Sequence, residues 1–447
     1  MMGLSKKLVK NIFRITLCSA LVIGCTTKSQ TKSKMITTNK PAKVELISES
    51  GKFKLLVDKK PFYIKGAGLE FGKIKSVAKH GGNSFRTWRT ENGKQSGKEV
   101  LDEALKNGLM VTMGIEVARE RHGFDYDNEV AVKEQLERIR QEVIALKNHP
   151  ALLMWGIGNE LNLRYTNPKV WDAVNDISKM IHKEDPNHLT TTMLAGISKK
   201  EVDFIKERSS DLDLLCFQIY GDLLKLPTLV KESGWKGAYI VTEWGATGHW
   251  EVPKTSWGVS IEENSTVKAA NYLARYNGGI AADPNQCIGS YVFLWGQKQE
   301  RTPTWYGIFL EDGSETESVD VMHYVWNNNT WPENRAPQIQ SFQLNNKTAY
   351  DNVILKLNEE CVVNFKVKNL ENEELNYSWE ILNESTDLKD GGDYEKRPKA
   401  VPFEIINSIE GNLVFKAPNN KGAYRLFAYV KDSDNNTATA NIPFKVN

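Results

Sequence analysis

The 447-residue sequence predicts a (β/α)8 barrel followed by a small all-β, immunoglobulin-like sandwich. Eight apolar runs of strand length alternate with amphipathic stretches between residues 44 and 331, which is the pattern of a parallel barrel of βα units. After Trp331 the sequence changes to short alternating runs separated by Asn, Asp and Gly, which is typical of an antiparallel sandwich. A doubly wound open sheet is the alternative to the barrel. It would usually carry a Gly-rich phosphate loop, and neither G-x-G-x-x-G nor G-x-x-x-x-G-K-S/T occurs.

The first 25 residues are typical of an export signal. Four Lys and Arg residues precede the apolar segment 15–23, which is too short to span a bilayer, and Gly24-Cys25 follows. Residues 22–25 resemble the lipobox of bacterial lipoproteins, so we expect removal of residues 1–24 and lipidation of Cys25. The polar residues 25–42 would then form a flexible tether. We predict an outer-membrane lipoprotein, on the periplasmic or surface face, that contacts the membrane only through its anchor; an ordinary secretory peptide is the alternative.

Charge and cysteine content exclude several classes of protein. The chain has 58 Lys and Arg against 56 Asp and Glu, and cleavage before Cys25 removes four positive charges from a net +2, leaving −2. A chain without a basic excess is not expected to bind nucleic acid. The other mature cysteines, Cys216, Cys287 and Cys361, are too scattered for a disulfide framework. Neither H-E-x-x-H nor paired Cys/His spacing occurs, so we expect no metal and no cofactor. The sequence does not indicate an oligomeric state.

The predicted elements follow one another in a regular order. The barrel is expected to span residues 43–331 and the sandwich residues 332–447, and Val44 is expected to run almost directly into the first strand. The predicted barrel strands are residues 62–69, 83–88, 109–115, 151–157, 189–194, 214–220, 238–241 and 287–295. The predicted helices are residues 100–106, 130–146, 168–183, 201–207, 265–276 and 318–326. The predicted sandwich strands, after a linker at 332–337, are residues 353–357, 362–367, 377–382, 413–417, 424–430 and 437–446.

Two glutamates stand just past apolar runs, at the ends of the fourth and seventh predicted strands. Barrel strands are buried on both faces, and Glu is rarely buried without a partner. The positions of Glu160 and Glu243 therefore indicate that these side chains have a function. Catalytic groups of a barrel lie at these strand ends. Glycoside hydrolysis requires one protonated and one ionised carboxyl group, and mutual repulsion separates the two pKa values. The alternative is a pair of capping or salt-bridging glutamates.

Gly158-Asn159-Glu160 on strand four, together with Glu243 on strand seven, resembles a clan of retaining glycoside hydrolases that carry a 4/7 glutamate pair. The resemblance covers the whole barrel. It implies that Glu160 is the acid/base and Glu243 the nucleophile. It also implies that Asn159 binds the sugar 2-hydroxyl.

The same resemblance implies roles for three more residues at strand ends. Arg86, at the end of strand two, would orient the nucleophile, and its charge would keep Glu243 ionised. Tyr220, at the end of strand six, would hydrogen-bond the nucleophile, and Trp295, at the end of strand eight, would form the floor of the sugar subsite. A structural ion pair is the alternative for Arg86, and core packing is the alternative for Tyr220 and Trp295.

Aromatic residues are concentrated in the predicted barrel and its loops. Eleven of the 12 Trp lie between Trp88 and Trp331. The loop after strand seven carries His249, Trp250 and Trp257, and the loop after strand eight carries Trp305. Exposed aromatic faces beside a catalytic pair suggest platforms on which sugar rings stack, and we expect the three Trp to bind substrate in this way. His249 is a candidate partner for a sugar hydroxyl. Ordinary loop packing is the alternative for each.

The sequence therefore predicts a retaining β-glycoside hydrolase that cleaves a neutral β-glucan by double displacement, with carboxyl groups about 5–5.5 Å apart. A barrel with one immunoglobulin-like domain in a lipoprotein resembles glycoside hydrolase family 158, which implies an endo-β-1,3-glucanase acting on a laminarin-like polysaccharide. A β-mannanase or another glycosidase resembling families 2 or 5 is the alternative, although the sandwich domains that usually precede a family 2 barrel are missing. A non-catalytic glycan-binding lipoprotein is the alternative of a different class. The C-terminal domain, with Trp379 as its only Trp, is expected to be a structural spacer, and glycan binding is the alternative.

Overall fold

The computed structural model describes residues 40–70 and 72–447. The predicted signal peptide, Cys25 and nearly all of the predicted tether lie outside the described residues, and these features stay predictions. Among the described helices, none combines the length and the apolar character needed to cross a membrane.

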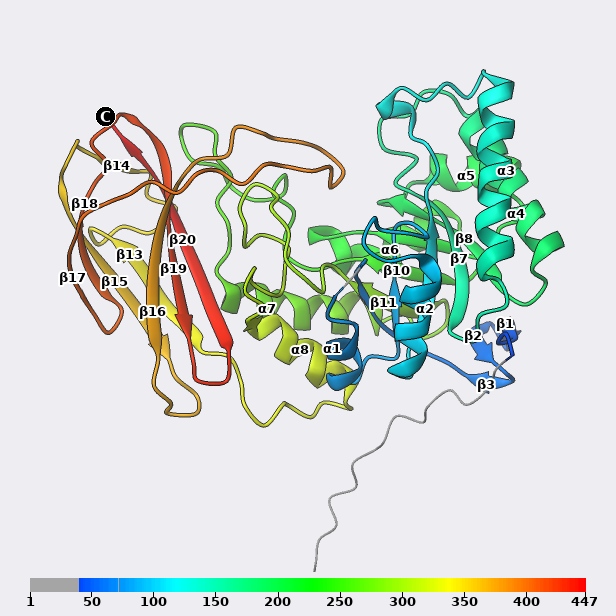
Figure 1. The fold of residues 1–447 in the computed structure, drawn as a ribbon, viewed down its shortest axis with the longest axis horizontal. Coiled ribbons are helices and arrows are strands. Elements are labelled where there is room, and N and C mark those ends of the chain that lie inside the picture. The colour runs from blue at the N-terminus through cyan, green and yellow to red at the C-terminus, as the bar shows by residue number, and fades with distance from the viewer. Residues whose placement is uncertain (1–39, 71) are drawn as a thin grey trace, which may run out of the picture. The chain divides into compact units, whose positions relative to one another are not determined.

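A closed barrel of eight parallel strands forms the centre of the N-terminal part of the chain (Figure 1). Its strands are β4 (Ile64–Gly68), β5 (Ser84–Arg86), β6 (Met110–Ile115), β7 (Leu152–Asn159), β8 (Leu189–Ala195), β9 (Leu215–Gln218), β10 (Tyr239–Glu243) and β11 (Cys287–Val292). Their order in space follows the chain, and the barrel closes where β11 pairs with β4. The predicted (β/α)8 barrel is confirmed, because each predicted barrel run overlaps one of these strands.

Seven helices connect successive barrel strands among the described residues, and an eighth, α8, follows the last barrel strand. They are α1 (Ile74–Lys79), α2 (Gly97–Lys106), α3 (Glu129–Leu146), α4 (Lys169–Glu184), α5 (Lys199–Arg208), α6 (Leu226–Ser233), α7 (Ser265–Arg275) and α8 (Glu317–Trp326). Polar caps fix several starts: Ser96 and Glu99 form a capping box on α2, and the side chain of Asn264 accepts a hydrogen bond from the backbone of Val267 on α7. The sequence did not predict α1 and α6, because six and eight residues are too few for a clear helical period.

A small antiparallel sheet precedes the first barrel strand. It consists of β1 (Val44–Glu49), β2 (Lys52–Val57) and β3 (Lys60–Pro61). Val44 and Leu55 of this sheet join a buried apolar cluster with barrel residues such as Leu153, Met154 and Met193. The expectation that Val44 runs almost directly into the barrel is therefore wrong, since residues 44–61 first form this sheet.

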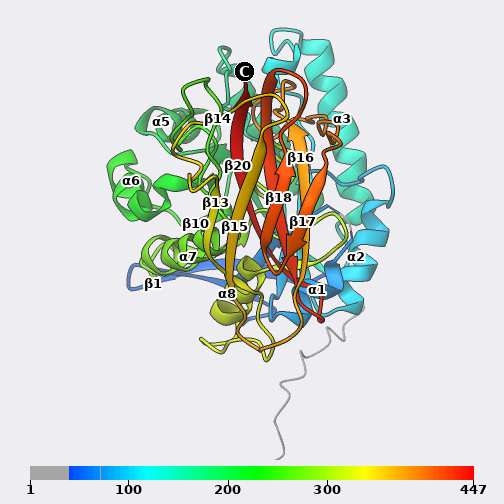
Figure 2. The same ribbon diagram turned by 90° about the vertical axis from the view of Figure 1, so that its left-hand side faces the viewer.

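The C-terminal part is a sandwich of two sheets, as predicted (Figure 2). One sheet contains β12 (Glu315–Thr316), β20 (Asn436–Val446), β19 (Gly422–Lys431) and β16 (Asn376–Asn383), with β14 (Val353–Leu355) paired to β20. The other contains β13 (Gln338–Leu344), β15 (Glu360–Lys368), β18 (Asn412–Lys416) and β17 (Ile405–Ile409). Buried Leu, Val, Phe and Ala from both sheets form a core of their own.

The sandwich and the barrel share backbone and buried polar contacts. Strand β12 lies just before α8 in the chain, yet it pairs in parallel with β20 of the sandwich. The buried carboxylate of Glu262 accepts hydrogen bonds from Lys268 at 2.5 Å and from Asn441 of the sandwich at 2.7 Å. Arg425 of the sandwich donates to the backbone oxygen of Ser260 at 2.8 Å. The sandwich therefore packs against a side of the barrel through these contacts, in addition to its covalent connection.

Candidate active site

Four barrel strands end in polar residues that meet at one point. Arg86, Asn159, Gln218 and Glu243 are the last residues of β5, β7, β9 and β10, and all four are buried. Glu160 follows β7 directly. Because the carboxyl ends of parallel strands in a barrel meet at the same end, residues far apart in the chain gather here.

The Glu243 carboxylate is held by four hydrogen-bond donors. Its Oε1 accepts from Arg86 Nη1 at 3.3 Å, Trp88 Nε1 at 2.9 Å and Gln218 Nε2 at 2.8 Å. Its Oε2 accepts from the Tyr220 hydroxyl at 3.0 Å. Donors of this number, one of them a guanidinium, fix the carboxylate in one orientation and leave its oxygens directed by the protein. The predicted contacts of Arg86 and Tyr220 with Glu243 are therefore present.

The Glu160 carboxyl has the opposite surroundings. Within the part of the chain that the structure describes, no group donates a hydrogen bond to it, although Arg121 donates to its backbone oxygen at 3.3 Å. Burial, followed by the charge of Glu243, raises the pKa of Glu160 from 4.5 to about 7. Its backbone is left-handed, with φ of 52°, two residues after Gly158, whose φ is 74°. A strained non-glycine backbone of this kind is common where a side chain must be aimed at a site.

Asn159 and Gln218 join Arg86 and the Glu243 carboxylate in a buried amide network. Asn159 Oδ1 accepts from Arg86 Nη2 and from Gln218 Nε2, both at 2.7 Å. With its oxygen occupied, Asn159 has an amide nitrogen that donates to no described residue, and the residue lines the cavity, which suits the predicted bond to a sugar hydroxyl. Gln218 Oε1 is buried and has no partner among the described residues.

A cavity of about 1140 Å³ opens over these residues. Its wall includes Asn159, Glu160, Gln218, Tyr220 and Glu243. The predicted loop residues His249 and Trp250 also line it, and Trp250 is 57% exposed. Burial lowers the pKa of His249 to about 4, so the imidazole is neutral at physiological pH and can both donate and accept.

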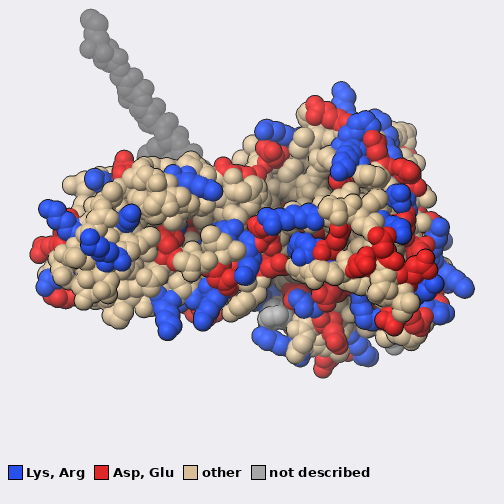
Figure 3. All heavy atoms as spheres, turned by 90° about the horizontal axis from the view of Figure 1, so that it is seen from above, with Lys and Arg blue, Asp and Glu red and all other residues tan. Residues whose placement is uncertain are grey.

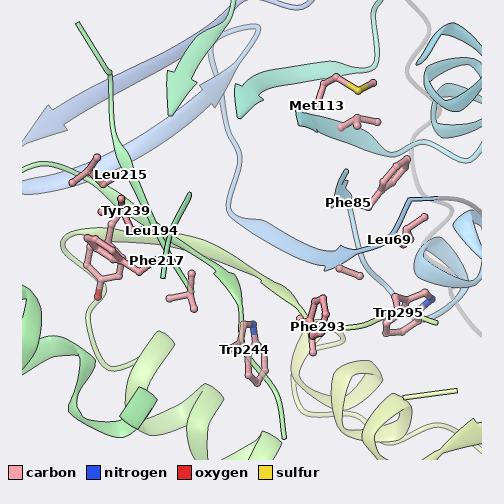
Figure 4. Packing of buried hydrophobic residues seen from close by; sticks show 14 of the residues in the cluster. Leu69, Phe85, Met113, Leu194, Leu215, Phe217, Tyr239, Trp244, Phe293 and Trp295 are labelled. Carbon is pink, nitrogen blue, oxygen red and sulfur yellow. The ribbon is translucent and has the colours of Figure 1, made fainter. Parts of the chain in front are cut away.

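Three predicted aromatic platforms are not where the sequence placed them. The Trp295 indole is 1% exposed, packs edge-on against His80 and Phe309 and lies in the hydrophobic core beside Leu69 (Figure 4), so its role as the subsite floor is wrong even though the residue borders the cavity. Phe293 lies two residues earlier and faces Tyr220 and Trp88 edge-on at the cavity wall. Residue type favoured Trp295, whereas the backbone geometry after β11 decides which ring reaches the site.

Trp257 and Trp305 do not belong to the residues that line the cavity. Trp305 is 2% exposed, and its indole nitrogen donates to the backbone oxygen of Thr247 at 2.9 Å, so it fixes the loop after β10. Trp257 is half-buried away from the wall. For both residues ordinary loop packing is the correct interpretation.

Sequence reasoning missed Trp88, Gln218 and Phe293. Trp88 follows Arg86 by two residues, so alternation along an extended chain puts the two side chains on the same side. Gln218 is a polar residue inside a buried apolar run, which is a signal that could have been used. Five consecutive sandwich residues, 390–394, also line the cavity, so the expectation that the C-terminal domain is only a spacer is wrong.

Comparison with known proteins connects this arrangement to carbohydrate chemistry. Residues 78–246 match the family described as "Glycosyl hydrolases family 2, TIM barrel domain", and both glutamates lie within the match. A β-glucuronidase from Bifidobacterium dentium, solved with coumarin-3-O-glucuronide, is 20% identical over 64% of this chain and 49% of its own, with a TM-score of 0.50. A putative β-galactosidase from Bacteroides fragilis is 15% identical over 91% of this chain and 57% of its own, with a TM-score of 0.49. The chain spans about half the length of the structures it matches. Residues 78–246 are therefore similar to a glycoside hydrolase barrel domain.

Proposed function

We propose that this protein is a retaining β-glycoside hydrolase, with Glu160 as acid/base and Glu243 as nucleophile. The observation that carries the proposal is the contrast between the two carboxyl groups. The Glu243 carboxylate accepts hydrogen bonds from four donors, whereas the Glu160 carboxyl accepts none from the described residues and has a raised pKa. A site with one ionised and one protonated carboxyl group suits acid-assisted displacement at an anomeric carbon.

In the first step a Glu243 carboxylate oxygen attacks the anomeric carbon while the bond from that carbon to the glycosidic oxygen breaks. The Glu160 proton passes to the departing oxygen, and a covalent glycosyl-enzyme remains. In the second step ionised Glu160 takes a proton from water, whose oxygen attacks the anomeric carbon and releases Glu243. Asn159 Nδ2 would donate to the hydroxyl next to the anomeric carbon, and Arg86 and Tyr220 keep the attacking carboxylate in line.

We infer that the substrate is a neutral β-glycan chain. The cavity wall carries nine Asp or Glu but only five Lys or Arg, so a uronate substrate would meet net negative charge. Charges of both signs are mixed on the face shown in Figure 3, with no broad basic area to attract an acidic polymer. A cavity of about 1140 Å³ exceeds the roughly 300–1,000 Å³ typical of small-molecule sites and has room for several sugar rings. Endo action on β-1,3-glucan, the prediction from the family 158 resemblance, is therefore the first candidate.

Reducing-sugar release from laminarin, β-mannan and xylan tests the substrate, together with aryl β-glucoside, β-galactoside and β-glucuronide. We expect release from a neutral β-glycan, and retained configuration in the first product seen by proton NMR. Preferential cleavage of the glucuronide, as the name of the Bifidobacterium dentium enzyme would suggest, would contradict the neutral substrate. Binding of these glycans without cleavage of any substrate would favour the glycan-binding alternative and refute the enzyme.

A further inference from the structure

A long loop of the sandwich reaches the catalytic end of the barrel. It connects β16 (Asn376–Asn383) to β17 (Ile405–Ile409) and is the orange segment that extends toward the barrel in Figure 1. Residues 390–394 of this loop line the same cavity as Glu160 and Glu243. The site therefore has a wall that the barrel does not supply.

Charged residues from three barrel loops hold the sandwich loop in place. Arg164 forms an ion pair with Asp390, and Arg121 lies 3.6 Å from Asp393. The most buried contact joins Arg301 to Glu395. The Glu395 carboxylate is fully buried and accepts from Arg301 Nη1 and from the Arg301 backbone nitrogen, both at 2.6 Å. A buried pair with several hydrogen bonds fixes geometry far better than an exposed ion pair does.

Two glycines make this close approach possible. Gly391 and Gly392 have φ of 59° and 71°, in the left-handed region that glycine adopts without strain. A Cβ on Gly391 would lie 2.7 Å from Arg121 Nη2, and one on Gly392 would lie 2.9 Å from Lys298 Nζ. Lys298 donates to the Gly392 backbone oxygen at 2.7 Å. Gly391 and Gly392 of the loop thus lie in close contact with side chains of the barrel.

The loop carries an aromatic side chain that the fold leaves open. Tyr394 is 80% exposed, yet it lies on the cavity wall. The neighbouring contacts place it on the side of the catalytic acid. One Arg121 guanidinium donates to the backbone oxygen of Glu160 at 3.3 Å and to that of Gly391 at 3.4 Å. An exposed aromatic face beside a glycan site offers a stacking surface for a pyranose ring.

We propose that Tyr394 is a platform for a sugar of the leaving-group part of the glycan chain, so that the sandwich completes the substrate cleft. This proposal rests on the proposed hydrolase activity. The acid delivers its proton to the leaving oxygen, so the sugars next to the Glu160 loop are those that depart. Tyr394 is therefore a specificity-determining residue that selects chains over short glycosides.

The experiment measures kcat/KM for oligosaccharides of two to seven units, prepared from the neutral β-glycan that the wild type cleaves, with laminarin tried first. In the wild type kcat/KM is expected to rise with length. Tyr394→Ala should lower kcat/KM for the longer chains about tenfold and leave the shortest nearly unchanged. Tyr394→Trp should restore the length dependence. Tyr350→Ala, which removes a sandwich Tyr that is 59% exposed and outside the cavity wall, is the matched control and should behave as the wild type.

The outcomes of this experiment distinguish failure of the Tyr394 platform from failure of the proposed hydrolase activity. If Tyr394→Ala follows the wild-type length dependence, the platform is refuted while the hydrolase stands. Equal losses at every length would also refute it, since they would point to a general defect. If the wild type cleaves no substrate of the screen, the proposed function itself fails, and the platform fails with it.

Discussion

Glu160 and Glu243 are identical side chains that follow or end two strands of one barrel, but they lie in contrasting environments. Glu243 is 5% exposed and accepts hydrogen bonds from Arg86, Trp88, Gln218 and Tyr220. Glu160 faces the cavity without a donor among the described residues, and burial and the Glu243 charge raise its pKa. The surroundings, not the residue type, therefore distinguish the two carboxyl groups, and this difference supports the proposed roles of Glu243 as nucleophile and Glu160 as acid.

The largest effect is expected for Glu243→Gln. The variant lacks the attacking oxygen of the ionised form, so turnover should fall by about 10⁴-fold or more. Gln has the same shape, and the melting temperature should stay close to that of the wild type. Reducing-sugar release and thermal unfolding measure the two quantities. Activity near the wild-type level would show that the nucleophile is another residue.

Glu160→Gln should have a smaller effect that depends on the leaving group. Loss of an acid catalyst costs typically 10²–10⁴-fold, and polysaccharide cleavage should fall by about that amount. An aryl glycoside with a good leaving group needs little proton donation, so its first step should survive while the second step slows. Added azide, which attacks without a general base, should then restore turnover and give a glycosyl azide. Unchanged cleavage of the polysaccharide would remove Glu160 from the mechanism.

The raised pKa of Glu160 also predicts a pH-dependent stability difference. Between pH 4.5 and about 7 the folded protein keeps this proton and the unfolded chain loses it, so the carboxyl group lowers the free energy of unfolding as pH rises. Glu160→Gln has no ionisable carboxyl group at this position, so its free energy of unfolding should not fall in this way as pH rises. It should be about 3 kcal/mol more stable than the wild type at pH 8, and the gain should disappear at pH 4. Chemical denaturation at both pH values measures it, and a gain that does not change with pH would contradict the raised pKa.

The smallest effect is expected for Tyr220→Phe, which removes one of the four donors to Glu243. A lost hydrogen bond to a charged group should lower kcat about tenfold and change KM little, since the contact acts through the nucleophile. Tyr239→Phe is the matched control. Its hydroxyl donates to Asp283 at 3.0 Å from the other end of β10, far from the carboxylate. A similar loss in both variants would indicate general destabilisation of the strand.

The barrel, the sandwich and the glutamate pair could be predicted because each leaves a local pattern. Barrel strands are continuous apolar runs, and a Glu just beyond such a run is conspicuous. Contacts between distant segments leave no such pattern. Nothing around Tyr394 indicated that a loop more than 230 residues after Glu160 would reach the same cavity. Phe293 and Trp295 are both aromatic residues after β11, and only the backbone path decides that Phe293 faces the site while Trp295 enters the core.

The most direct test of the contrast between the two carboxyl groups needs no substrate. A carbon-13 NMR titration of the protein with labelled Glu side chains follows the Glu160 carboxyl, assigned by its absence in Glu160→Gln. We expect an apparent pKa near 7 in the wild type, and a lower value in Glu243→Gln because the neighbouring charge is gone. A wild-type value near 4.5, or one that Glu243→Gln leaves unchanged, would contradict the assignment of Glu160 as the acid held protonated by its surroundings.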